Sequence, residues 1–247
     1  LNLFFYIYAM EIAKNIAIIG HALYLEKEKA IIISDMHLGI EEALNKQGYL
    51  IPRFQLSDIK EKIQKIFDAA DVKEIIFNGD LKHEFGTIST TEWHSLISLI
   101  EFAGSYCKKI TIIKGNHDIL LEPIARKLDI KIQDYYKLND YFICHGDKII
   151  ENLDFHASKT VIIGNEHAAI SLRKSGRYEI YKCFLLGKFK NKVLVAMPSF
   201  NPMIEGSDIL KDQLLSPFLQ QNLSNFRVFI AADKIYDFGK VKDIESL

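Results

Sequence analysis

The sequence predicts a single domain of the α/β class, in which buried strands alternate with amphipathic helices. Short runs of β-branched residues recur up to residue 163 of the 247-residue chain, and apolar residues at helical spacing lie between them. After residue 168 the pattern changes to closely spaced strands without long helices, which indicates an antiparallel part. No linker rich in proline, glycine or serine interrupts the chain, so we expect one domain over residues 10–247.

Five buried strands are predicted in the first part. Each is a four-residue run dominated by apolar and β-branched side chains, a pattern typical of strands that are covered on both faces. They span residues 30–33, 74–77, 110–113, 141–144 and 160–163.

Two amphipathic helices are predicted between these strands, from apolar stripes over residues 59–70 and 93–100. Ser89 and Glu92 have the spacing of a capping box, in which each side chain accepts a hydrogen bond from a main-chain amide at the helix start. We therefore expect the second helix to begin just after Ser89. Asp118 is expected to cap a third helix over residues 119–128.

The second part is predicted to contain strands at residues 169–174, 178–186 and 192–197, with turns at Ser175-Gly176 and Lys190-Asn191. We expect a short helix and loops in the segment 203–226. Two roles stay open for this segment: a rim that contacts substrate, or a contact between two copies of the chain in a homodimer.

Composition excludes several classes of protein. Hydrophobic residues make up 49% of the chain, with only 13 glycines and 5 prolines, which excludes collagen-like and disordered proteins. The 31 basic and 32 acidic residues nearly balance, so any binding of nucleic acid must use a local patch. Three cysteines without C-x-x-C spacing indicate a reducing compartment, and we expect a cytoplasmic protein.

The N-terminal residues contain an apolar run at positions 3–10, which is far shorter than the roughly 18 residues that a membrane span needs. We therefore expect no membrane association. Because residue 1 is leucine and Met10 begins a more ordinary sequence, residues 1–9 are expected to lie upstream of the natural start.

A block of polar residues directly follows each of the five predicted strands. The carboxyl ends of strands in an open α/β sheet converge on one crevice, so these blocks are expected to meet in space. Carboxylate, amide and imidazole ligands without thiolate suit Mn²⁺, Fe or Zn²⁺. The blocks are Asp35-Met36-His37, Gly79-Asp80-Leu81-Lys82-His83, Gly115-Asn116-His117-Asp118, His145-Gly146-Asp147 and Gly164-Asn165-Glu166-His167.

The order of these blocks resembles the calcineurin-like metallophosphoesterase superfamily, whose motifs are D-x-H, G-D-x-x-H/D, G-N-H-D/E, a lone H and G-H-x-H. The resemblance runs from about residue 10 to about residue 240 and looks strongest with an SbcD-related branch of small archaeal phosphoesterases and bacterial ligase-associated phosphoesterases. Residues 182–187 and 197–202 are similar to segments of that subgroup. The resemblance implies a four-layer α/β/β/α sandwich with two mixed sheets.

The resemblance also implies two divalent metal ions at the convergence of the blocks. Asp80 would bridge the two ions, which together would activate water and clamp the phosphate. The first ion would be held by Asp35, His37, Asp80 and His167, and the second by Asp80, Asn116, His145 and the residue at position 165. The family pattern further implies that His117 protonates the leaving oxygen and that His83 orients His117.

The last block departs from the family pattern, because Asn165 stands where the family has histidine. Its amide oxygen is a weaker donor than imidazole for borderline metals and is more compatible with Mn²⁺ or Mg²⁺. We expect Mn²⁺, with Fe, Zn²⁺ or Mg²⁺ as alternatives, and a weaker second site. Glu166 alternates with its neighbours and is expected to point away from the ions.

Three functions stay open. The resemblance implies a phosphodiesterase or nuclease linked to DNA repair, with DNA or RNA as substrate. A second possible enzyme function is that of a phosphodiesterase for cyclic nucleotides or other small molecules. The third possible function is that of a scaffold or binding module whose metal site is impaired, and Asn165 would be the sign of that impairment.

Basic residues are concentrated in the second part of the chain. They would form either a surface that follows nucleic-acid phosphates or an ordinary solvated hairpin face, and we favour the hairpin face because strand alternation separates the charges. The residues are Arg173, Lys174, Arg177, Lys182, Lys188, Lys190 and Lys192.

Overall fold

The computed structural model describes residues 9–174 and 177–244. The expected turn at Ser175-Gly176 and positions 1–8 of the expected N-terminal extension lie outside the described residues. Ala9 is the first residue of strand β1 (Ala9–Ala13).

The first sheet has seven strands in the order β1-β2-β3-β4-β5-β6-β7. Strands β1 to β4 pair in antiparallel fashion, and β4 to β7 pair in parallel. The bounds after β1 are β2 Ile16–Ile19, β3 Ala22–Leu25, β4 Ala30–Ile33, β5 Glu74–Asn78, β6 Lys109–Ile113 and β7 Ile132–Gln133.

The second sheet has nine strands, seven of them in the order β14-β11-β12-β13-β10-β9-β8, while β15 pairs with β12 and with β16. Strand β10 is parallel to both of its neighbours, and β11, β12 and β13 are antiparallel as expected. The bounds are β8 Tyr135–Leu138, β9 Tyr141–Cys144, β10 Thr160–Ile163, β11 Ala168–Lys174, β12 Arg177–Phe189, β13 Lys192–Ala196, β14 Ser207–Asp208, β15 Arg227–Ala231 and β16 Ile235–Lys240.

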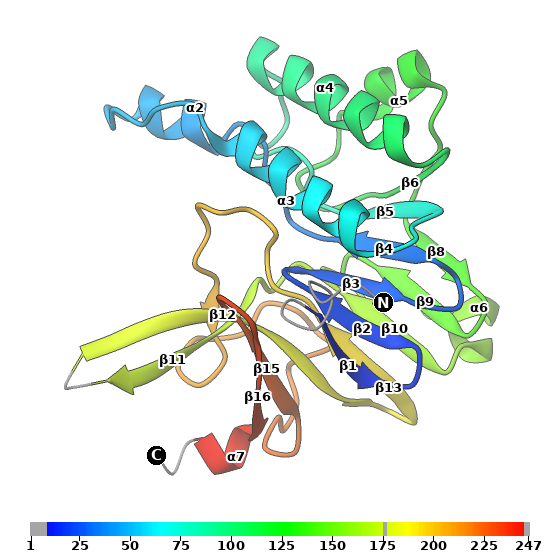
Figure 1. Ribbon diagram of the computed structural model, residues 1–247, viewed down its shortest axis with the longest axis vertical. Coiled ribbons are helices and arrows are strands. Elements are labelled where there is room, and N and C mark those ends of the chain that lie inside the picture. Colours follow the sequence, from blue (N-terminus) through cyan, green and yellow to red (C-terminus); the bar gives the residue numbers. More distant parts are fainter. Residues whose placement is uncertain (1–8, 175–176, 245–247) are drawn as a thin grey trace.

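Helices cover the outer faces of the two sheets (Figure 1). The helices α2 to α5 lie above the first sheet in this view, and α6 and α7 lie beside the second sheet. The described residues contain six helices: α2 Ile40–Lys46, α3 Gln55–Ala69, α4 Thr90–Tyr106, α5 Glu122–Leu128, α6 Leu153–Ala157 and α7 Val241–Ile244. No helix in residues 9–174 and 177–244 is both long and apolar enough to cross a bilayer.

Three apolar clusters separate four layers. In β4, Ile31 and Ile33 pack with the helices, whereas Ile32 packs against the second sheet. In β9, Ile143 faces the first sheet, and Phe142 packs with α6 on the outer side. This alternation follows from the two-residue period of a strand, and it confirms the predicted α/β/β/α sandwich with two mixed sheets.

Most predicted elements are confirmed. Strands β4, β9 and β10 have the expected bounds, and β5 and β6 are each one residue longer. The capping box is present, with the Ser89 side chain accepting from the Glu92 amide and the Glu92 side chain accepting from the Ser89 amide. Helix α4 therefore begins directly after Ser89, as the spacing predicted.

The prediction of a short helix in the segment 203–226 is wrong for the described residues, which contain only β14 there. Main-chain amides of this segment are bound partly by main-chain carbonyls of turns and neighbouring strands and partly by side chains, without forming a helix. The carboxylate of Glu166 accepts from the amides of Leu215 and Ser216, both at 2.8 Å. Phe218 and Leu219 are buried against the second sheet, so packing fixes the segment as a loop.

Several basic side chains of the second part serve the fold. The ammonium of Lys182 donates to the main-chain oxygens of Ser199, at 2.8 Å, and Asn201. Lys192 is buried and donates to the carbonyls of His156 and Ser158, while Lys190 pairs with Glu151. These contacts favour the structural interpretation of the three lysines over a surface that follows phosphates.

Lys182 predicts a pH dependence of stability. Burial and the neighbouring charge of Lys62 lower the pKa of Lys182 from 10.5 to about 7. Between these values the unfolded chain binds more protons than the folded chain, so rising pH stabilises the fold through Lys182. We therefore compare the free energy of unfolding of the unmodified protein with that of Lys182→Met. The difference is expected to change in favour of the unmodified protein by about 1 kcal/mol per pH unit above pH 7.

Urea unfolding between pH 7 and pH 10 measures this difference. Lys188→Met is the matched control, because Lys188 is exposed on the same strand as Lys182 and its substitution is expected to change stability little. A difference for Lys182→Met that stays constant with pH would contradict the prediction.

Candidate metal centre

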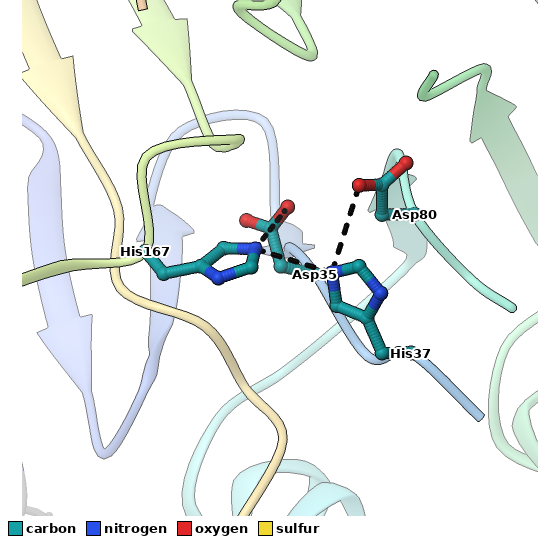
Figure 2. Close-up of side chains that lie close together, drawn as sticks. All are labelled: Asp35, His37, Asp80 and His167. Atoms are coloured by element: carbon teal, nitrogen blue, oxygen red, sulfur yellow. Dashed lines mark hydrogen bonds and ion pairs between the residues drawn. The ribbon is translucent and has the colours of Figure 1, made fainter. Parts of the chain in front are cut away.

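The five polar blocks meet where strands β4, β5, β6, β9 and β10 end. Figure 2 shows Asp35, His37, Asp80 and His167 pointing toward one another, although they come from three separate loops. One ligand atom from each of these four residues lies within 4.8 Å of the others. The predicted convergence of the blocks is therefore present.

The spacing of these atoms fits one divalent ion. The Nε2 atoms of His37 and His167 are 3.2 Å apart, Nε2 of His167 is 3.3 Å from Oδ1 of Asp35, and Nε2 of His37 is 3.6 Å from Oδ2 of Asp80. Two ligands bound to one ion at about 2.1 Å lie about 3.0–3.4 Å from each other, a range that includes the first two distances, while the third is slightly longer. The four side chains form a metal-binding Asp/His cluster.

Asp80 is also in contact with a second set of ligand types. Its Oδ2 atom is 3.4 Å from Nε2 of His145, which is 3.0 Å from Oδ1 of Asn116. The other ring nitrogen of His145 lies 3.2 Å from the carbonyl oxygen of Asn78 and can donate to it. That hydrogen bond leaves Nε2 to face Asp80, as in histidine ligands whose tautomer is set by the protein.

The last block places its residues on different sides. The main-chain amide of Asn165 donates to both oxygens of Asp35, at 3.1 and 3.2 Å, and so fixes that carboxylate. Glu166 lies between Asn165 and His167 in the chain, and its carboxylate points away to the amides of Leu215 and Ser216. The expectation that Glu166 faces away from the cluster is confirmed.

Left-handed backbone is concentrated in this centre. Ten non-glycine residues have positive φ in the described part of the chain, and five of them belong to the polar blocks. Each left-handed residue costs about 1 kcal/mol of conformational energy, and this cost is smallest for Asn, Asp and His. They bend the chain sharply behind each strand, so that two side chains of one block can face the same pocket. The five residues are Asp35, His37, Asp80, Asn165 and His167, with φ between 42° and 63°.

Two carboxylates are buried in this centre. Asp35 and Asp80 expose 0% and 2% of their surface. Burial opposes their ionisation, yet the charge of His167 lowers the pKa of Asp35, and the hydrogen bond and charge of His145 lower the pKa of Asp80. Both are therefore ionised at neutral pH, and a nearby cation is the partner that buried anions require.

The imidazoles of the centre differ in charge. Burial and the neighbouring His167 lower the pKa of His37 to about 3, so His37 is neutral and able to bind a metal. Burial also opposes the protonation of His145, but the hydrogen bond with Asp80 and the charge of Asp35 raise its pKa to about 9. His145 thus provides positive charge to the two carboxylates when no ion does so.

His117 is held at the edge of the cluster. Its main-chain amide donates to Oδ1 of Asp80 at 2.9 Å, and its Nδ1 atom lies 2.6 Å from the carbonyl oxygen of His83. Its Nε2 atom is 3.9 Å from Oδ2 of Asp80. The orienting contact from residue 83 is thus made by the main chain, whereas the ring of His83 is 6.1 Å from that of His117 between centroids.

Glu92 fixes the loop that carries this carbonyl. Its carboxylate is buried and accepts from the amides of His83, Glu84 and Ser89 at 3.2, 2.9 and 2.9 Å. The sequence identified Glu92 only as part of a capping box. Its contacts with residues 83 and 84 depend on tertiary packing, and the spacing of residues gave no signal for them.

Two further side chains brace the first block. The amide of Gln55 donates to the carbonyl oxygens of Met36 and His37 at 3.1 and 2.8 Å. The hydroxyl of Ser199 donates to the carbonyl oxygen of Asp35 at 2.6 Å. Gln55 gave no signal in the sequence, whereas Ser199 lies in the segment 197–202 that the resemblance singled out.

The prediction that Asp118 caps the following helix is wrong. Helix α5 begins at Glu122, and no side chain caps it. Asp118 instead accepts from the amides of Leu81 and Gly115, both at 3.0 Å, and so ties the second block to the third. Burial and the charge of Asp80 raise the pKa of Asp118 to about 6.

Comparison with known proteins identifies one family to which the sequence is similar. The model of the calcineurin-like phosphoesterase family matches residues 29–223. No protein in the curated set is similar enough in sequence to match the chain.

Solved structures supply similar folds. A nuclease MPE from Pseudomonas putida is 17% identical, with a TM-score of 0.67 over 93% of this chain and 98% of its own. Vps29 from Chaetomium thermophilum is 12% identical, with a TM-score of 0.42 over 82% and 81%. Yfce, a phosphoesterase from E. coli, is also 12% identical, with a TM-score of 0.40 over 81% and 86%. The similarity to the Pseudomonas protein supports the fold described above.

Glu92→Gln tests the bracing of His117. The glutamine side chain has one oxygen to accept from three amides, and its NH₂ group would face at least one of them. We expect a loss of about 1–3 kcal/mol in the free energy of unfolding. We also expect ¹⁵N NMR of the imidazoles to show His117 in mixed tautomers, because the carbonyl of His83 is no longer fixed.

Glu101→Gln provides the control, since Glu101 is exposed on the same helix and its substitution is expected to change stability by less than about 0.5 kcal/mol. Unchanged stability and an unchanged His117 tautomer in Glu92→Gln would show that Glu92 does not position this loop.

Proposed function

Because the chain belongs to the calcineurin-like phosphoesterase family, we propose that it is a metal-dependent phosphodiesterase that cleaves nucleic acid. The observation that carries the proposal is the buried carboxylate of Asp80, placed between the imidazoles of His37 and His145. A carboxylate in this position suits a pair of divalent ions that act on one phosphate. The nuclease among the similar structures supports nucleic acid as substrate, and the link with DNA repair rests on the subgroup that the sequence resembles.

The proposed enzyme would hold two divalent ions, and Mn²⁺ is the first choice. The residues that would hold them are Asp35, His37, Asp80 and His167 for one ion, and Asp80, Asn116, His145 and Asn165 for the other. Bound ions would polarise the phosphoryl oxygens and make water a better nucleophile near neutral pH. Asn165 keeps its main-chain contact with Asp35, and we expect its weaker side-chain donor to make the second site the weaker one.

His117 is proposed as the proton donor to the leaving oxygen. Its Nδ1–H is directed to the carbonyl of His83, so a protonated ring carries its second proton on Nε2, on the side of Asp80. A proton donor must be held within hydrogen-bond reach of the leaving oxygen, and the contacts at both ends of His117 provide that rigidity. A positioning role for the ring of His83 remains part of the proposal.

The competing functions make different demands on the site. A scaffold does not need ionised, buried carboxylates, which cost stability unless a cation is bound. The presence of both buried carboxylates beside four histidines therefore favours an enzyme. A phosphodiesterase for cyclic nucleotides would use the same centre, so only substrate comparison separates it from a nuclease.

Activity and its loss test the proposal. We expect Mn²⁺ to stimulate hydrolysis of bis(p-nitrophenyl) phosphate, and Asp80→Asn to abolish it. His117→Ala is expected to lower kcat by about 10²–10⁴, because an oriented proton donor is lost. The exposed His94 supplies the control, and His94→Ala should keep full activity. Full activity in His117→Ala would show that His117 is not the proton donor. Absence of hydrolysis by the unmodified protein would refute the proposal that it is an enzyme.

Metal titration tests the unequal sites. Calorimetry with Mn²⁺ is expected to show one tight and one weaker ion, and Asn165→His is expected to tighten the weaker ion by about tenfold. The gain should be larger for Zn²⁺ than for Mg²⁺, because imidazole prefers borderline metals. Two equally tight sites in the unmodified protein would contradict the assignment of Asn165.

A further inference from the structure

Phe85 is an aromatic side chain that the fold leaves in water beside the centre. It follows the second polar block, and 55% of its surface is exposed. Its ring centroid lies 3.8 Å from that of His117, at an angle of 47° between the rings. Phe85 takes part in none of the three apolar clusters of the described residues, so the core does not account for it.

The main chain before Phe85 is fixed. The amide of Glu84 donates to Glu92 at 2.9 Å, and the ammonium of Lys82 donates to the carbonyl of Glu84. The same carboxylate of Glu92 holds the amide of His83. Because these contacts also set the carbonyl that orients His117, Phe85 and His117 are positioned by one rigid loop segment.

The exposed charges near Phe85 do not favour phosphate, because Lys82 is fully buried. The carboxylate of Glu84 is partly exposed and lies 4.0 Å from the ammonium of Lys46, so the pair has no excess positive charge. Lys46 is also 3.3 Å from Glu42. A group bound beside Phe85 is therefore recognised through its ring rather than through a phosphate.

We propose that Phe85 is a stacking platform for the nucleobase on the leaving-group side of the cleaved linkage. This proposal rests on the function proposed above: if His117 faces the leaving oxygen, the nucleoside attached to that oxygen lies next to Phe85. Bases stack on aromatic side chains whatever their sequence. A base inside a duplex is already stacked and paired, so the platform selects single-stranded nucleic acid over duplex.

The test compares three DNA substrates in the presence of Mn²⁺: a labelled single-stranded oligonucleotide, the same strand with one internal tetrahydrofuran (abasic) residue, and the duplex. In the abasic strand, one linkage has the abasic residue on its leaving-group side. We expect the protein to cleave this linkage about tenfold more slowly than the other linkages of the strand. Phe85→Ala should raise KM for the single strand by about tenfold with little change in kcat, and should cleave the abasic linkage as readily as its neighbours.

Two variants separate stacking from a structural effect. Phe85→Tyr retains the ring and is expected to retain both the low KM and the discrimination against the abasic linkage. Tyr106→Ala removes an exposed aromatic side chain from the end of α4, where it stacks on Phe67, and should leave the substrate preference unchanged.

The outcomes distinguish this proposal from the proposed function. A fall in kcat with unchanged KM in Phe85→Ala would mean that Phe85 only supports His117, and would overturn the platform. Equal cleavage of abasic and normal linkages by the unmodified protein would overturn it as well. Hydrolysis of bis(p-nitrophenyl) phosphate without cleavage of any DNA would overturn the platform and leave a phosphodiesterase. Failure to hydrolyse either substrate would overturn both.

Discussion

The burial of two ionised carboxylates, Asp35 and Asp80, is the constraint on which the centre depends. A buried negative charge is tolerated only with positive partners and hydrogen bonds, and the surrounding loops provide both. Imidazoles surround the carboxylates, and the amides of Asn165 and His117 donate to them. The sharp left-handed turns behind the strands are the conformations that make these contacts possible. The strain of those turns and the burial of charge are both consistent with a site shaped for cations.

Elements whose signal is local could be predicted from the sequence. The five apolar strands and the helix start at Ser89 depend on neighbouring residues, and the structure confirms them. The convergence of the polar blocks was also predictable, since strand ends converge by topology, and Asp35, His37, Asp80 and His167 do lie together. The expected weakness of the site at Asn165 is a statement about ligand type, and it remains a prediction.

Contacts made by the main chain could not be predicted. The carbonyl oxygen of His83 lies 2.6 Å from Nδ1 of His117, and residue type carries no information about such a main-chain contact. Asp118 has a plausible local partner as a helix cap, but a tertiary contact with Leu81 and Gly115 satisfies it instead. In the loop 203–226, the amides of Leu215 and Ser216 are bound by Glu166, which is distant in sequence. Segments 182–187 and 197–202 are linked by contacts of the same kind, because Lys182 donates to the carbonyl oxygen of Ser199 and the hydroxyl of Ser199 donates to the carbonyl oxygen of Asp35.

The two sheets contribute different halves of the centre: Asp35, His37, Asp80 and Asn116 follow strands of the first, whereas His145, Asn165 and His167 follow strands of the second. Neither half contains all four members of the Asp/His cluster. The cluster is therefore complete only when the two sheets are docked, and an ion held there would join them as a cross-link. Ion affinity thus reports on native assembly of the sandwich, and partly folded chains are expected to lack tight ion binding.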